Sequence, residues 1–520
     1  MISCAIIERP GRWRWAGVVI VFTLALAPVL PLAVAAGSQG EADWLEAGFG
    51  ASLLRSFKLA GVVAMLSLGA GLPCGVLAGL YRFPLRGLLL PLLLLPLLAP
   101  PFLWGLGLSM LRIRLGLPPD GLLSGLTGTA LAFATGAIPL VFFAAMLATR
   151  SLSRAQVDGA RLAGGEGRLI HLALRHAFAV ALLAALLAGV LTLSDPGAGQ
   201  ILGYEGAASQ MLVAFSASYD ISLAARQALA LAGLVLLASL PLAIMAAPRL
   251  SAALSGRTSA LAPLAKNSRV GWLVTTLVLA IVAATAGLGL AGLSGPAFER
   301  PAFERAWQEA ARTLPDTLIY VAGSGILAAV AGCVLAFCAG RQRRLRAVVL
   351  GGLVVIFALP PSMGALGLVT AAADAPPALD GVLRSRFTVV LWLSLRLFPV
   401  VAIFAMRSLA GMSPSWAMAA AVHGVTLRVY LWRVLAPWLG PAAAVSCVLV
   451  GLLALGDISS MLLLHPPGRG SLPLAIFTVM ANAPESLSAS LSLIYIGGFA
   501  VVLAIAWGGA SMVKSKGAKR

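Results

Sequence analysis

The chain has 520 residues, of which 60% are hydrophobic and 11% are charged, a composition that excludes an ordinary soluble domain and is typical of a membrane protein with many spanning helices. Its formal net charge of +19 would suit nucleic-acid binding, but most basic residues lie in alternate loops between the apolar stretches. The positive-inside rule accounts for that placement, so we expect these loops and both termini in the cytoplasm and no nucleic-acid partner.

Apolar stretches of about 20 residues, long enough to cross a lipid bilayer, recur along the whole chain. They predict an all-α membrane protein with about twelve transmembrane helices, at residues 15–36, 57–80, 86–111, 127–149, 177–196, 225–247, 270–293, 316–340, 347–371, 388–406, 438–457 and 488–510. The first stretch has the basic flank of a signal peptide, but its apolar part is longer than a signal sequence requires. We therefore expect a retained first helix.

The two halves of the sequence repeat each other at an offset of 260 residues. PPFLWGLGL begins at Pro100 and PPSMGALGL at Pro360, and Pro139 matches Pro399 at the same offset. An even number of spans in each half predicts two parallel six-helix repeats related by an axis along the membrane normal. The predicted domains are a first repeat at residues 1–248, a cytoplasmic linker at 249–269 and a second repeat at 270–520.

The paired prolines are candidates for a transport path. Pro100 and Pro101 in the third stretch, like Pro360 and Pro361 in the ninth, should break their helices where these face protein or water. Lining of a pore or gate is one interpretation. The other is that proline and glycine are simply commoner in membrane helices than in soluble ones.

Two polar segments, about 151–177 and 408–437, interrupt the apolar pattern at matching places. In the second segment Ser413 is a suitable N-cap, and Gly424 stands where a left-handed residue ends a helix. Apolar residues at helical spacing follow until Pro437, which is expected to mark the return into lipid. Each segment is therefore predicted to form a helix, a glycine turn and a second helix outside the membrane, with Gly164 matching Gly424.

These segments resemble the EAA loop of ABC importer permeases, in which Glu-Ala-Ala is followed by a glycine and later by an apolar-Pro sequence. The second segment places Ala419 and Ala420 on the alanines and keeps Gly424 and Pro437, but has Met418 at the Glu position. The first segment has an acid at the Glu position and has lost the proline. Its matching residues are Asp158, Gly159, Ala160 and Gly164.

The resemblance implies the fold of a type I ABC importer permease in a bacterial inner membrane. The two loops would be coupling helices that dock on two copies of a cytoplasmic ABC ATPase, and an extracytoplasmic binding protein would deliver the solute. The fusion of two halves and the segment LLLHPPGRGSLPLAIF at 462–477 are similar to iron(III) permeases and their thiamine-transporting relatives. Iron(III) is therefore the first substrate expected, with thiamine or another small solute as alternatives.

The chain itself is not expected to be an enzyme. It contains no GxxxxGK[ST] loop, so ATP and Mg²⁺ would be bound by the partner ATPase, and no cofactor or metal is expected on this chain. The four histidines show no metal-ligand spacing, and the five cysteines contain no CxxC pair. The alternative function is a twelve-helix secondary transporter coupled to an ion, which should carry acids near the middle of the membrane, whereas here the acids lie at helix ends.

Three charged residues lie within or at the ends of apolar stretches, where a charge is costly. Arg396 is about ten residues into the tenth stretch, and it either attracts an anionic solute or pairs internally with Asp457 or Asp195. Those two aspartates end the eleventh and fifth stretches. They either line the mouth that receives substrate or are solvated at the helix ends.

Overall fold

The computed structural model describes residues 12–37, 48–255, 268–468 and 470–517. Within these ranges the protein is helical throughout and contains no β-strand. Nine helices are long and apolar enough to cross a membrane, and the number rises to twelve if each of three sharply bent helix pairs is one span. Each of the twelve predicted stretches overlaps one of these helices or pairs. The described part of the chain therefore has the make-up of a multi-pass α-helical membrane protein.

The chain divides into two compact units, and each unit combines segments from both halves of the sequence. Unit 1 comprises residues 1–38, 232–257 and 316–469, and unit 2 comprises 39–231, 258–315 and 470–520. Helices α10 (Ile221–Ser255) and α13 (Arg300–Ala339) contribute to both units. The compact units therefore differ from the predicted repeats, because the first helices of the chain belong to the unit that contains most of the second half.

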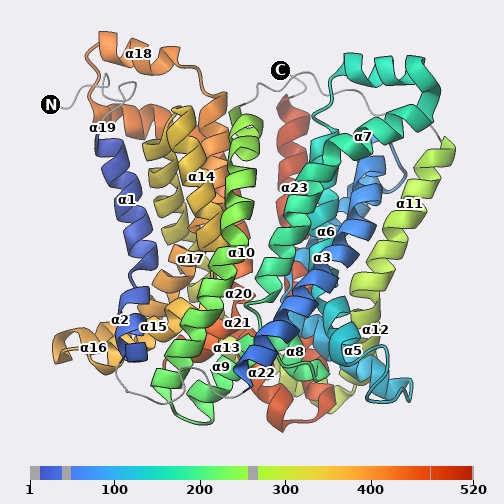
Figure 1. Cartoon of the computed structure of the whole chain (residues 1–520), viewed down its shortest axis with the longest axis vertical. Helices are drawn as coiled ribbons and strands as arrows, with labels where there is room; N and C mark the ends of the chain where they lie inside the picture. The colour runs from blue at the N-terminus through green and yellow to red at the C-terminus, as the bar shows by residue number, and fades with distance from the viewer. Residues whose placement is uncertain (1–11, 38–47, 256–267, 469, 518–520) are drawn as a thin grey trace. The chain divides into compact units, whose positions relative to one another are not determined.

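In unit 1 the N-terminal helices pack against helices from the second half of the sequence: α1 with α14 and α17, and α2 with α15 (Figure 1). Phe22 of α1 lies against Gly352 of α14, where any side chain would collide with the ring. The helices of this unit, besides its parts of α10 and α13, are α1 (Arg12–Leu26), α2 (Val29–Gly37), α14 (Arg343–Ala358), α15 (Pro361–Ala373), α16 (Pro377–Leu383), α17 (Arg386–Gly411), α18 (Ser415–Val422), α19 (Leu427–Tyr430), the π-helical turn η3 (Leu431–Leu435), α20 (Ala436–Leu455) and α21 (Ile458–Leu464).

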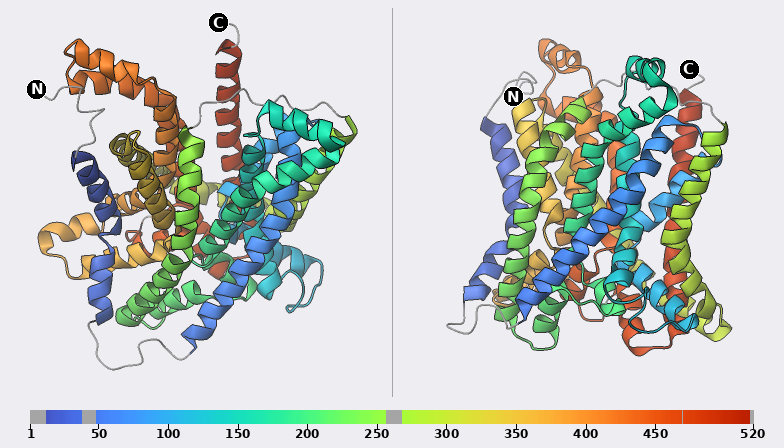
Figure 2. Two further views of the ribbon diagram at one scale, coloured as in Figure 1. Left: turned by 45° about the horizontal axis from the view of Figure 1, so that its top comes forward. Right: turned by 45° about the vertical axis from the view of Figure 1, so that its right-hand side comes forward.

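Unit 2 is built around the close packing of α3, α6 and α7, which lie side by side in both views of Figure 2. Gly75 of α3 faces the backbone of α6, where a Cβ atom would come within 2.4 Å of the Phe142 carbonyl oxygen. Such small residues let membrane helices approach closely. The helices are α3 (Phe49–Leu80), α4 (Arg86–Leu98), α5 (Pro101–Arg114), α6 (Gly125–Thr149), α7 (Arg154–Thr192), α8 (Gly197–Leu202), α9 (Ala207–Ser216), α11 (Ser268–Val282), η2 (Ala283–Gly287), α12 (Leu288–Ala297), α22 (Leu472–Asn482) and α23 (Glu485–Gly517).

The predicted breaks at the paired prolines are confirmed. The chain bends by 95° between α4 and α5, at Pro100 and Pro101, and by 77° between α14 and α15, at Pro360 and Pro361. Each second proline is the first residue of the new helix, where its missing N–H costs no hydrogen bond. Both bends are packed inside their own unit, since Pro100, Pro360 and Pro361 are buried and Pro101 is half-buried.

Two predicted helix limits were wrong. The helix that contains the fifth stretch begins just after the break at Gly164 and Gly165 instead of at residue 177, and the helix that contains the eleventh begins at Leu427 instead of residue 438. In both places the polar second helix of the loop continues without interruption into the apolar helix. The predicted linker is shorter as well, because α10 continues to Ser255 and α11 begins at Ser268. Residues 256–267 lie outside the described part of the chain.

Candidate functional site

Two bent segments precede α20 and the apolar part of α7, and we name them by the glycine at which the chain turns. The Gly424 elbow comprises residues 413–435 of unit 1, and the Gly165 elbow comprises residues 153–175 of unit 2. Figure 1 shows α18 running across the ends of the long helices of its unit, and Figure 2 shows the start of α7 doing the same in its own. Neither elbow is a simple extension of the helix that precedes it.

The first helix of the Gly424 elbow ends as its local sequence predicts, but it begins one residue later, with Pro414 instead of Ser413 at the N-cap position. The Ser413 hydroxyl accepts a hydrogen bond from the Ser415 amide, 3.4 Å away, and α18 then runs to Val422. Gly424 has φ +66°. Its amide donates to Ala421, and the Val425 amide donates to Ala420, which is the hydrogen-bond pair of a Schellman motif. A left-handed glycine therefore ends this helix, as expected.

The Gly165 elbow turns one residue later than predicted. Ser153 forms a capping box with Gln156, in which each side chain accepts from the other residue's backbone, a Ser-x-x-Gln pattern that could have been recognised in the sequence. Gly164 is extended, with φ 174°, whereas Gly165 has φ +68° and ψ −158°, a region that essentially only glycine occupies. Gly165, rather than Gly164, is therefore the conformational counterpart of Gly424.

The two elbows have the same pattern of burial. Residues 151–164 and 411–424, which are 260 positions apart, show the same order of buried, half-buried and exposed side chains, position by position. Leu162 is 90% exposed, and Val422, its counterpart, is 84% exposed. The sequence interpretation missed both residues, although their shared offset was visible. Each elbow therefore presents an aliphatic side chain to its surroundings just before the chain turns.

Three of the residues that carry the family resemblance lie on the first helix of each elbow. Asp158 is exposed and lies 3.8 Å from Arg154 in an ion pair, whereas Met418 at the matching position is exposed and apolar. At the next two positions the elbows have the same burial: Gly159 and Ala419 are exposed, and Ala160 and Ala420 are half-buried. The small residues on this face would let another surface approach closely.

Pro437, which is expected to mark the return into lipid, lies inside one continuous helix. The helix runs from Leu427 to Leu455 without a break, and the π-helical turn η3 occupies the five residues just before α20. A proline within a helix leaves the carbonyl four residues earlier without its donor and collides with it, and a wider turn relieves that collision. The second helix of the elbow and the apolar helix are thus one rod, roughly 43 Å long at 1.5 Å per residue.

A tyrosine and a glutamate missed by the sequence interpretation fix the Gly165 elbow to its unit. The hydroxyl of Tyr81, at the end of α3, donates to the carboxylate of Glu166, which also pairs with Arg161 at 2.9 Å. Burial, together with the neighbouring carboxylate, raises the pKa of Tyr81 well above its ordinary value, so the hydroxyl stays protonated and can donate. No local signal relates the two residues, since they are 85 positions apart.

Gly424→Ala and Gly165→Ala should each destabilise their elbow by about 1–3 kcal/mol, because an L side chain strains a backbone with positive φ. Gly164→Ala should cost less, since its φ is extended and an added Cβ meets only the Arg168 side chain, at 3.1 Å from its Cβ. Hydrogen exchange at the elbow amides measures the difference. The expectation fails if Gly164→Ala accelerates exchange as much as Gly165→Ala does.

Arg396 of α17 is paired with Asp457, one of its two predicted internal partners. Its Nη1 donates to Oδ2 of Asp457 at 2.6 Å, and the side chains are 16% and 1% exposed, respectively. Asp457 also accepts from the amide and hydroxyl of Ser460. The expectation that Asp457 is solvated at a helix end is therefore wrong, since the carboxylate is buried and its charge is satisfied by Arg396.

The ion pair adjoins the bend at Pro361. The Ser460 hydroxyl lies 2.9 Å from Nε1 of Trp392, which donates to it, and 3.4 Å from the Pro361 carbonyl oxygen. The indole of Trp392 in turn fills the space beside Gly364, where no side chain would fit. Asp457, which follows the rod, is therefore joined through the Ser460 hydroxyl to Trp392 of α17, beside the start of α15.

Asp195 has a different setting. It is half-buried, and its Oδ1 accepts from the Gly197 amide at 2.8 Å, which starts α8. The residue that matches Arg396 in the first half is Gly136, where a Cβ atom would lie 3.2 Å from the Pro96 carbonyl oxygen. The buried pair seen at Arg396 and Asp457 thus has no counterpart at the matching position of unit 2.

Among the described residues, no group of three or more His, Cys, Asp and Glu side chains could hold a metal ion. Cys74, Cys333, Cys338 and Cys447 are free thiols, and Cys4 lies outside the described residues. Comparison of the chain with protein-family models, with curated proteins and with solved structures gave no match. The function must therefore be inferred from the elbows and the helices they join.

Proposed function

We propose that the chain is the permease of an ATP-driven importer, with the fold of a type I ABC importer permease and twelve spanning helices in two parallel repeats. The observation that carries this proposal is the pair of elbows: two exposed helices with one burial pattern, each presenting an aliphatic side chain beside a glycine turn. Two equivalent surfaces on one chain suit two copies of the same partner. That partner is the cytoplasmic ATPase, which binds ATP and Mg²⁺ in place of this chain.

The rigid continuity of the Gly424 elbow with α20 supports a mechanical role. Movement of an ATPase bound to α18 would tilt the rod that ends beside Asp457. Through the ion pair with Arg396, and through the Ser460 hydroxyl, which bonds to Asp457 and lies 3.4 Å from the Pro361 carbonyl oxygen, the tilt would reach the bend between α14 and α15. We infer that this bend is a gate on the solute path, and that a binding protein delivers iron(III), thiamine or another small solute to it.

Reconstitution separates this function from ion-coupled transport. The purified chain in proteoliposomes, together with the ATPase that co-purifies with it and the binding protein, should take up solute only when ATP is supplied, with two ATPase subunits per chain by native mass spectrometry. A chain reconstituted alone should give no uptake under a proton or sodium gradient. Uptake by the chain alone under such a gradient would overturn the proposal in favour of the secondary transporter.

A further inference from the structure

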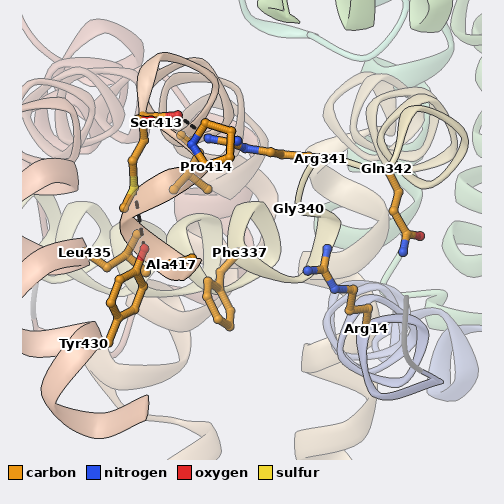
Figure 3. A pocket seen from close by; sticks show the side chains of 12 residues that line it. Arg14, Phe337, Gly340, Arg341, Gln342, Ser413, Pro414, Ala417, Tyr430 and Leu435 are labelled. Atoms are coloured by element: carbon orange, nitrogen blue, oxygen red, sulfur yellow. Dashed lines mark hydrogen bonds between the residues drawn. The ribbon is translucent and has the colours of Figure 1, made fainter. Parts of the chain in front are cut away.

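A cavity of about 250 Å³ lies beneath the Gly424 elbow, inside unit 1 (Figure 3). The helices around it share one level: α1 and α14 begin there, and α13 and α17 end there. Figure 3 shows Tyr430 and Leu435 on one side and Arg14 and Gln342 on the other, with Phe337 between them. Apolar helices begin and end at the surface of a bilayer, so the cavity lies at the level of lipid headgroups.

The charged groups that reach this cavity are all positive. Arg14, whose side chain is buried, and Arg341, which donates to the Met412 carbonyl oxygen, both line it. The other polar lining groups are the amide of Gln342 and the hydroxyls of Ser413 and Tyr430, and no lining residue carries a carboxylate. Guanidinium groups bind phosphate through several N–H donors at once, so this lining favours a phosphate anion.

The rest of the lining is apolar, and the space is small. Apolar side chains form the remaining walls: Phe337, Leu409, Met412, Pro414, Ala417 and Leu435. The volume is roughly eight times the ~30 Å³ that one water molecule occupies in the liquid. It accommodates a phosphate with a short apolar attachment and is too small for most drug-sized ligands, whose pockets begin at about 300 Å³.

Beneath the Gly165 elbow, protein side chains occupy the place that corresponds to the cavity. Tyr81, the residue 260 positions before Arg341, is fully buried, and its hydroxyl is bonded to Glu166 of that elbow. Leu152, Val157 and Leu169 pack with it in one apolar cluster beneath the elbow. Protein side chains therefore support the Gly165 elbow from below, whereas a cavity with two arginines lies beneath the Gly424 elbow.

We propose that the cavity beneath the Gly424 elbow binds a phosphate group with an apolar attachment, as carried by the headgroup of an anionic phospholipid. Basic pockets between membrane helices on the cytoplasmic side take such headgroups. The bound group would contact Ala417 of α18 and Tyr430 of α19 and so hold the elbow at a fixed angle. Binding here does not depend on the proposed transport function.

Native mass spectrometry of the full chain tests the site with added phosphatidylglycerol or phosphatidylcholine. One phosphatidylglycerol should be retained in preference to phosphatidylcholine. Arg341→Gln, at an exposed side chain that should not disturb folding, should weaken retention about fivefold. Arg343→Gln is the matched control, because Arg343 is exposed nearby and does not line the cavity. Ala417→Phe, which fills the cavity and leaves both arginines in place, should also abolish retention.

A second measurement distinguishes the source of the phosphate. Thermal stabilisation of the detergent-solubilised chain by inorganic phosphate or glycerol phosphate, lost in Arg341→Gln but kept in Arg343→Gln, would support the site and assign it to a soluble phosphate. Equal retention of the two lipids without such stabilisation would overturn the proposal. Equal behaviour of Arg341→Gln and Arg343→Gln in both measurements would overturn it as well.

Discussion

Replacing Arg396 by methionine is expected to lower the free energy of unfolding by about 3–5 kcal/mol, because it leaves the Asp457 carboxylate buried without its cation. Only 1% of the Asp457 side chain and 16% of the Arg396 side chain are exposed, so water cannot take the place of the lost partner. Denaturant unfolding of the detergent-solubilised chain measures the loss of stability.

Two further variants make this prediction specific. Arg396→Met combined with Asp457→Asn should recover most of the lost stability, because asparagine removes the charge and can still accept from the Ser460 amide. Arg384→Met is the matched control, since Arg384 and Asp380 form an exposed ion pair on the same unit that should contribute under about 1 kcal/mol. If Arg396→Met is no more destabilising than Arg384→Met, the buried pair does not hold the end of the rod.

Leu162→Asp and Val422→Asp should each weaken binding of the proposed ATPase partner about 30-fold or more, and together should abolish it. Side chains that fill a pocket on a partner contribute 2 kcal/mol or more at the centre of an interface, and a carboxylate there would be buried without a counter-charge. Neither change should destabilise the chain, since both positions are almost fully exposed. Pull-down of the ATPase and ATP-dependent uptake measure the effect.

Leu122→Asp is the control for this pair. Leu122 is 79% exposed in the loop between α5 and α6, which the topology expected from the sequence puts on the opposite side of the membrane. The Leu122→Asp variant should bind the proposed ATPase partner as tightly as the unsubstituted chain does. If Leu122→Asp lost as much binding as Val422→Asp, or if the variant with both elbow substitutions bound normally, the elbows would not be the docking surfaces.

The sequence predicted those features that a few neighbouring residues determine. The bends follow from Pro-Pro pairs, which cannot continue a helix without loss, and the turn at Gly424 follows from a capped alanine-rich helix that meets a glycine. Two adjacent glycines made the other elbow ambiguous, because either residue can adopt positive φ. The π-helical turn before Pro437 relieves the collision that this proline would cause in a regular helix. The residues within the turn are not of a type that predicts it.

Features that depend on distant residues were harder to predict. Tyr81 and Glu166 meet only because α3 and α7 pack together, and nothing in either local sequence indicates it. Arg396 had two possible aspartate partners, and only the packing of α17 against the end of α20 selects Asp457. The exposure of Leu162 and Val422 was hidden for a different reason: an aliphatic residue on a short helix is indistinguishable, in sequence, from one that faces a core.

The exchange of segments between the units sets an order of events during synthesis. Helices α1 and α2 leave the ribosome first, but the helices they pack against in unit 1, α14, α15 and α17, begin roughly 300 residues later. At about 5–20 residues per second, that delay is roughly 15–60 s. During this time the first two helices reside in the bilayer without these partners, so they must be apolar enough to remain stable in lipid alone. Neither half of the chain can complete its packing before the other has been translated.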